Sequence, residues 1–149
     1  MRIFLSICLL GFLLLFQNCK KDENSFSYCT GCPISSWTGN YNGTGTYFVA
    51  VSGETFEGVN VNVSIENTYD STLLIKLTAE NYISESFTTS KTDDNHYILI
   101  GTGSRTLDIG LKKNDNQYKL DGTFKKNTWN KIDSVWIVNQ SLTFSALKQ

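Results

Sequence analysis

Hydrophobic and polar residues alternate along most of the chain after Trp37. In residues 58–67, three valines and Ile65 take every second position and polar side chains fill the positions between them. Because successive side chains of a β-strand point to opposite faces, this pattern predicts a strand with one buried face. The pattern recurs, and the predicted strands are 37–51, 58–67, 73–77, 83–87, 96–100, 107–111, 118–124 and 142–146.

The segments between these strands are rich in residues that form turns. Residues 67–71, 92–95 and 114–116 contain the Asn and Asp side chains that tolerate a left-handed backbone, and no window has a helical apolar stripe. We therefore predict an all-β fold of about eight antiparallel strands. Closure into an up-and-down barrel would remove both sheet edges, and a two-sheet β-sandwich is the alternative. Gly43 and Gly45 favour the barrel, since glycine lets a strand bend sharply.

The first 18 residues have a different pattern. Residues 3–16 form an apolar run without charge, preceded by Arg2 and followed by Gln17, Asn18 and Cys19. Fourteen helical residues would span about 21 Å, which is short of the hydrocarbon thickness of a bilayer. The run is therefore interpreted as a secretory signal peptide, residues 1–18.

This segment and the residues after it resemble the lipoprotein signals of bacteria, in which the cysteine after the cleavage site is acylated. The charged run KKDE, residues 20–23, is similar to the segment that follows this cysteine in surface lipoproteins of the Bacteroidota. The resemblance implies a lipid on Cys19, attachment to the outer membrane and display on the cell surface. More than one acyl chain would make such an attachment durable.

Residues 19–36 are interpreted as the lipidated cysteine and a tether, and residues 37–149 as one β domain. The tether contains Cys29 and Cys32, the two thiols left after Cys8 is removed and Cys19 is lipidated. An exported protein meets an oxidising environment, so a disulfide between them is preferred over a redox or zinc site.

The strand pattern looks like the lipocalin-like or calycin-like barrels of exported bacterial lipoproteins. Trp37 is similar in position to the lipocalin tryptophan, although Ser35 stands where that family has glycine. The resemblance implies a barrel that holds a small ligand in its mouth.

Composition excludes several other classes of function. The formal net charge is −1, so no positive surplus is available to bind nucleic acid. The chain has a single histidine, His96, beside a predicted turn, and the Asp- and Asn-rich loops lack the ligand pattern of a calcium site. We therefore expect no catalytic residues, no metal and no cofactor, and the protein is not expected to be an enzyme.

Binding of a small molecule, lipid or glycan at the cell envelope is the expected function. Aromatic side chains would supply apolar or sugar-stacking surface, and the candidates are Trp37, Tyr41, Tyr47, Trp129 and Trp136. The alternative for most of them is a place in the core or in a cross-strand pair. Trp129 is the exception, because it lies in the polar stretch 125–131. The alternative is a structural or inhibitory surface protein that acts through its loops and has a packed interior. A pocket inside the sheet would favour the first function, and side chains that fill this space would favour the second.

Overall fold

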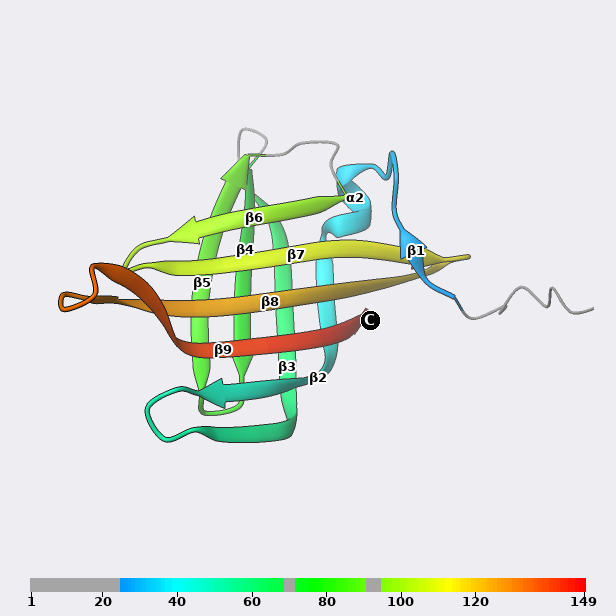
Figure 1. Ribbon diagram of the computed structural model, residues 1–149. Helices are drawn as coiled ribbons and strands as arrows, with labels where there is room; N and C mark the ends of the chain where they lie inside the picture. Colours follow the sequence, from blue (N-terminus) through cyan, green and yellow to red (C-terminus); the bar gives the residue numbers. More distant parts are fainter. Residues whose placement is uncertain (1–24, 69–71, 91–94) are drawn as a thin grey trace, which may run out of the picture.

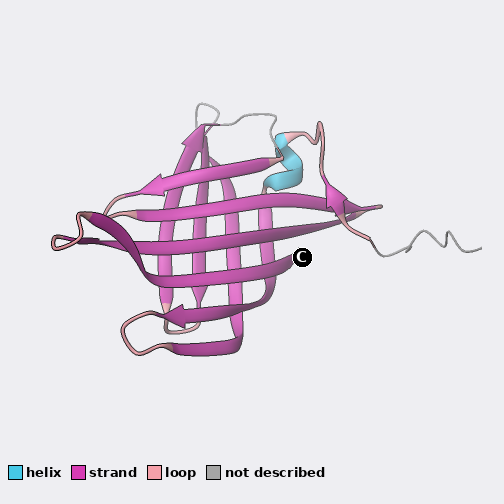
Figure 2. Cartoon of the chain, in the orientation of Figure 1, coloured by secondary structure: helices cyan, strands magenta, loops and turns pink. Residues whose placement is uncertain are grey.

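The computed structural model describes residues 25–68, 72–90 and 95–149, and this part of the chain is almost entirely β-structure (Figures 1 and 2). The elements are β1 (Ser27–Tyr28), α2 (Ile34–Trp37), β2 (Gly39–Val49), β3 (Glu54–Thr68), β4 (Thr72–Ala79), β5 (Ile83–Ser90), β6 (His96–Gly101), β7 (Arg105–Asn114), β8 (Gln117–Asn130) and β9 (Val135–Lys148). The prediction of an all-β fold is confirmed. The described residues contain no helix of sufficient length and apolarity to span a bilayer. The predicted signal peptide and Cys19 lie outside the described residues.

All strands belong to one antiparallel sheet with the order β1-β7-β8-β9-β2-β3-β4-β5, and β6 pairs with β7. The first and last long strands are neighbours, because β2 pairs with β9 from Tyr41↔Lys148 to Val49↔Gln140. Among the described strands, β5 and β6 do not pair with each other. The prediction of a closed barrel is therefore wrong. The alternative predicted two sheets, whereas a single sheet continues through β9 and β2 and folds into two layers (Figure 1).

This sheet folds over itself where β2 and β3 bend. In Figure 1, β2 starts parallel to the axis of β3–β5 and ends beside β9, which crosses that axis. The bend brings backbones very close together: a Cβ atom on Gly43 would lie 2.0 Å from the carbonyl oxygen of Ser145. The register of β2 also shifts between Gly45 and Tyr47. The two glycines thus lie where β2 bends, but the barrel closure that they were expected to favour does not occur.

Side chains fill the space enclosed by the folded sheet. Trp37, Tyr41 and Phe124 are each at most 1% exposed, and they pack with leucine, isoleucine and valine side chains from all the long strands. Where β5 and β6 do not pair, side chains close the gap. The Phe87 ring occupies the place that a Cβ on Gly101 would need, at 2.9 Å, and Glu85 forms an ion pair with Arg105.

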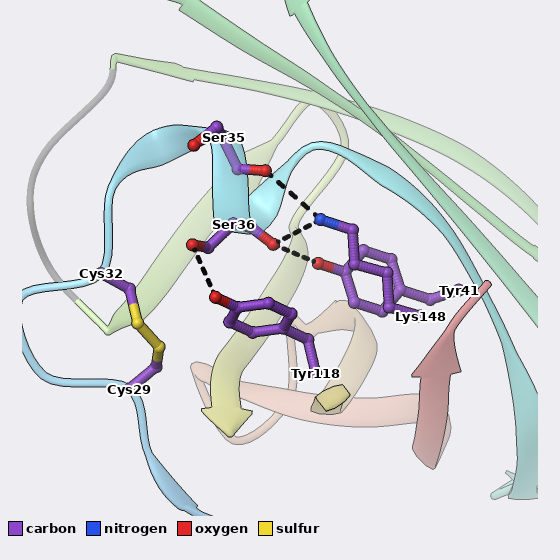
Figure 3. The surroundings of a disulfide bond; sticks show 7 residues. All are labelled: Cys29, Cys32, Ser35, Ser36, Tyr41, Tyr118 and Lys148. Carbon is purple, nitrogen blue, oxygen red and sulfur yellow. Dashed lines mark hydrogen bonds between the residues drawn. A yellow bond between two sulfur atoms is a disulfide. The ribbon is translucent and has the colours of Figure 1, made fainter. Parts of the chain in front are cut away.

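The segment before β2 covers one end of the interior (Figure 3). Cys29 and Cys32 are joined by a disulfide, and the Cys29 amide donates to the carbonyl oxygen of Leu111 at 2.9 Å. The carbonyl oxygen of Ser36 accepts from the hydroxyl of Tyr41 at 3.0 Å and from Nζ of Lys148 at 2.9 Å. These bonds attach α2 to both the first and the last long strand. The packed domain therefore includes the segment from β1 onward, which the sequence had assigned to the tether.

We predict that Gly43→Ala lowers the free energy of unfolding by about 3 kcal/mol or more, because the added methyl group collides with the backbone of β9. Gly53→Asn is the matched control. Gly53 has φ +70 and nothing within 4 Å of an added Cβ, and asparagine tolerates this conformation, so the expected loss is below about 1 kcal/mol. Urea denaturation measures both variants. Equal stability of the two would show that the close approach of β2 and β9 does not hold the bend.

Candidate ligand-binding groove

A polar groove crosses the outer face of the folded sheet over the central parts of β9, β8 and β2. Its volume is about 910 Å3, and it is open to solvent. Hydroxyl, carboxylate and backbone groups dominate its lining, which includes Thr44, Thr46, Thr123, Thr143, Ser145, Glu57, Asp108 and Asp121. The groove therefore offers many hydrogen-bonding groups on a surface that the sheet holds in place.

The alternation of β9 explains why hydroxyl groups line the groove. Leu142 and Phe144 are buried, so Thr143 and Ser145 between them point to the outer face. Thr143 pairs with Thr46 on one side and with Thr123 on the other. Three threonines from three adjacent strands therefore form a row across the sheet, where their positions are fixed by the backbone ladder.

The carboxylate of Asp121 at this surface interacts with two lysines and a serine. Its carboxylate is 2.6 Å from Nζ of Lys112 and 3.5 Å from Nζ of Lys119, and it accepts a hydrogen bond from Oγ of Ser145 at 2.7 Å. Burial pushes the pKa of Asp121 up, but the hydrogen bonds from Lys112 and Ser145 and the charges of both lysines outweigh it and leave the pKa below its usual value. The bond to Asp121 raises the pKa of Lys112. Asp121 is thus ionised and its charge is balanced.

His96 and Tyr28 border the same groove. Nε2 of His96 forms a hydrogen bond with the carboxylate of Asp108 on the adjacent strand. Among the described contacts, the bonding partner of the His96 ring is Asp108. Tyr28 is 55% exposed, and its ring lies against Gly110, where an added Cβ would be 2.8 Å from the ring. An aromatic ring therefore stands at the edge of a hydroxyl-rich surface.

Three of the predicted ligand-binding residues belong to the core. Trp37, Tyr41 and Tyr47 are at most 3% exposed. Trp37 packs edge-on against Tyr97, with 4.7 Å between the ring centroids. Burial raises the pKa of Tyr41 well above its usual value and also raises that of Tyr47. These aromatic residues stabilise the interior, and no ligand can reach them from solvent in this conformation.

The other two predicted residues, Trp129 and Trp136, lie together at the tip of the hairpin formed by β8 and β9. They are paired across the strands, and their ring centroids are 5.2 Å apart. Trp129 is 43% and Trp136 is 58% exposed. The sequence did not predict that they would meet, because both lie between the predicted strands 118–124 and 142–146.

The sequence analysis also did not identify the groove. Its residues are the polar positions between apolar ones in strands that were predicted correctly, such as Thr143 between Leu142 and Phe144. Such positions face solvent on most sheets. The sequence does show that these outward positions carry small side chains with hydroxyl groups. It does not show that β2 pairs with β9, and this pairing is what brings the positions together.

No three His, Cys, Asp or Glu side chains of the described residues converge on a point where they could hold a metal ion. The chain matches no protein-family model and no curated protein sequence. The groove lining consists of hydroxyl, carboxylate and backbone groups that can form hydrogen bonds.

Proposed function

We propose that this protein binds a neutral glycan in the groove on the outer face of its sheet, at the surface of a bacterial cell. The row of hydroxyl groups from Thr46, Thr143 and Thr123 supports this proposal most strongly. Sugars present hydroxyl groups at regular spacing, and a rigid row of donors and acceptors matches them without a loss of side-chain freedom on binding.

The charges of the groove favour a neutral ligand. The carboxylate of Asp121 is paired with Lys112 and Lys119, that of Asp108 contacts His96, and the exposed carboxylate of Glu57 adds negative charge to the lining. A phosphate or carboxylate ligand would have to displace one of these partners, and a lipid chain would leave the hydroxyl groups without hydrogen bonds. A sugar can bond to the same groups while Asp121 stays paired with its lysines, and the half-exposed ring of Tyr28 lies at the edge.

The filled interior favours a second candidate function. Large side chains occupy the space in which a lipocalin-like barrel would hold its ligand. A structural or inhibitory surface protein that acts through its loops needs no such space. This candidate differs from the first because it uses the ends of the hairpins, whereas a glycan would bind across the middle of the strands.

Attachment to the membrane through Cys19 is the second part of the proposal. It is supported by the apolar run of residues 3–16, which ends at Cys19 and is followed by the charged residues 20–23. The described chain begins at one end of the molecule, beside β1 (Figure 1). A tether there would leave the groove, which lies over the middle of the sheet, open to solvent.

We predict saturable binding to at least one neutral oligosaccharide of the cello-, xylo-, malto- or chito- series, measured by isothermal titration calorimetry. Thr143→Lys should weaken this binding by about tenfold or more, because the long side chain fills the centre of the groove and removes a hydroxyl group. Thr88→Lys makes the same change on the outer side of β5, outside the groove, and should leave the affinity unchanged. Absence of binding to all four series, or an equal loss in both variants, would contradict the proposal.

For the lipid, we predict that the protein incorporates a palmitate analogue in growing cells and that Cys19→Ala abolishes the label. Acylation requires the Cys19 sulfur, whereas Cys29 and Cys32 are used in the disulfide. In-gel fluorescence after labelling measures the result. Equal labelling of the two proteins would rule out attachment at this residue, and it would leave the glycan measurement unaffected.

A further inference from the structure

The hairpin formed by the ends of β8 and β9 extends beyond the rest of the sheet. β7 pairs with β8 only as far as Lys126, and β2 pairs with β9 only as far as Gln140. From Asn127↔Val138 to Asn130↔Val135 the two strands pair only with each other. We call residues 127–138 the hairpin tip. In Figure 1 it projects at the end of the molecule opposite β1.

Both faces of the hairpin tip carry exposed apolar side chains, beside Asn127 on one face and Thr128 and Asn130 on the other. Trp129, Trp136 and Val138 share one face, because directly opposed and alternate residues of paired strands point the same way. Val135 and Ile137 lie on the other face and are 47% and 46% exposed. Ile132, in the turn between the strands, is 93% exposed. Apolar side chains therefore surround the tip, and a two-stranded hairpin of this kind has little stability of its own in water.

This distribution favours a bilayer over a protein surface as the partner. A protein interface of ordinary shape covers one face of a hairpin and would leave the other face in water. The interfacial region of a bilayer encloses an inserted hairpin on all sides. Tryptophan is also the side chain that accumulates at this depth, since its ring is apolar and its N–H group can bond to water or to headgroups.

Lysines accompany the apolar residues. Lys125 and Lys126 lie at the base of the hairpin tip and Lys131 lies in its turn. All three are exposed, and in the described part of the chain they have no carboxylate partner. The one acidic residue of the tip, Asp133, accepts a hydrogen bond from Nδ2 of Asn130 at 2.6 Å. The local charge is therefore positive, which fits anionic lipid phosphates, and the polar turn limits insertion to the headgroup region.

We propose that the hairpin tip inserts into the headgroup region of a bilayer that contains anionic phospholipid. This contact is additional to any lipid on Cys19. A tether from Cys19 to Ser27 reaches about 25 Å when extended, whereas the 14 residues of β8 alone span roughly 45 Å. An N-terminal lipid therefore does not by itself bring the tip to the membrane. Two attachments at opposite ends would hold the sheet along the membrane surface.

Tryptophan fluorescence offers a direct test, because Trp37 is 1% exposed and buried in the core, so that changes on lipid addition report Trp129 and Trp136. The full-length chain is reconstituted with vesicles of phosphatidylglycerol and phosphatidylcholine that carry brominated acyl chains. We expect the emission to shift to shorter wavelength and to be quenched. Vesicles of phosphatidylcholine alone should give a much smaller change, since the lysines then meet no net negative charge.

Two variants keep both tryptophans at the hairpin tip and change its affinity for lipid. Ile132→Asp places a charge at the most exposed apolar position, and the combined variant Lys125→Gln, Lys126→Gln, Lys131→Gln removes the positive charge. Each should reduce the quenched fraction by about threefold or more in the anionic vesicles. Ile98→Asp is the control, because Ile98 is 67% exposed on β6, away from the tip, and quenching should persist.

Unchanged tryptophan emission in vesicles that carry the protein would overturn the proposal. A protein partner would then be the better explanation for the exposed apolar side chains of the hairpin tip. Equal quenching in the native chain and the Ile132→Asp variant would also overturn the proposal. The same holds if the Ile98→Asp control loses as much quenching as the Ile132→Asp variant. Circular dichroism of each variant shows whether the fold is kept. Oligosaccharide binding involves the groove alone, so its presence or absence is independent of these outcomes.

Discussion

The close contact between the backbones of β2 and β9 determines the shape of this protein. At Gly43 and Gly45 the two strands approach to a distance at which no side chain fits between them, since an added Cβ would lie 2.0 Å and 2.6 Å from carbonyl oxygens of β9. This approach lets the first long strand turn from one layer into the other while it stays paired. One continuous sheet can therefore enclose a core although its outermost strands, β5 and β6, do not join.

The enclosed core has a consequence for function. Trp37 enters it from α2 and Tyr41 from β2, and hydrogen bonds from Tyr41 and Lys148 hold α2 over its end. The aromatic residues that would line a ligand pocket are thus used to fill and seal the interior. What remains accessible is the outer face, where the small hydroxyl side chains of adjacent strands lie in register and where Asp121 is paired with Lys112 and Lys119. The proposed glycan site on the outer face follows from this arrangement. The hairpin tip also lies outside the core, and we propose that it contacts a bilayer.

The sequence predicted the strands well and their assembly less well. Val59 to Ile65 alternates without interruption, and the predicted strand coincides with the buried face of β3. Closure could not be predicted, because it depends on whether β5 and β6 meet, and alternation says nothing about strand neighbours. The burial of Trp37 could not be predicted either, since a short helix places it in the core. The length of β8 and β9 was underestimated, because the alternation changes phase at the register shift near Lys126 and both faces of the tip carry exposed apolar side chains.

The central claim is that the inside of the sheet is occupied by protein and that ligands bind on its outside. Methyl NMR of the protein, labelled at Thr, Ile, Leu and Val and titrated with oligosaccharide and with a free fatty acid, tests this claim most directly. We expect the oligosaccharide to shift the methyl signals of Thr46, Thr123 and Thr143. Neither ligand should shift the methyl signals of Leu77, Leu111 or Ile109. Saturable shifts of these inner methyl signals with fatty acid would contradict it, because they would show that the interior opens to hold a ligand.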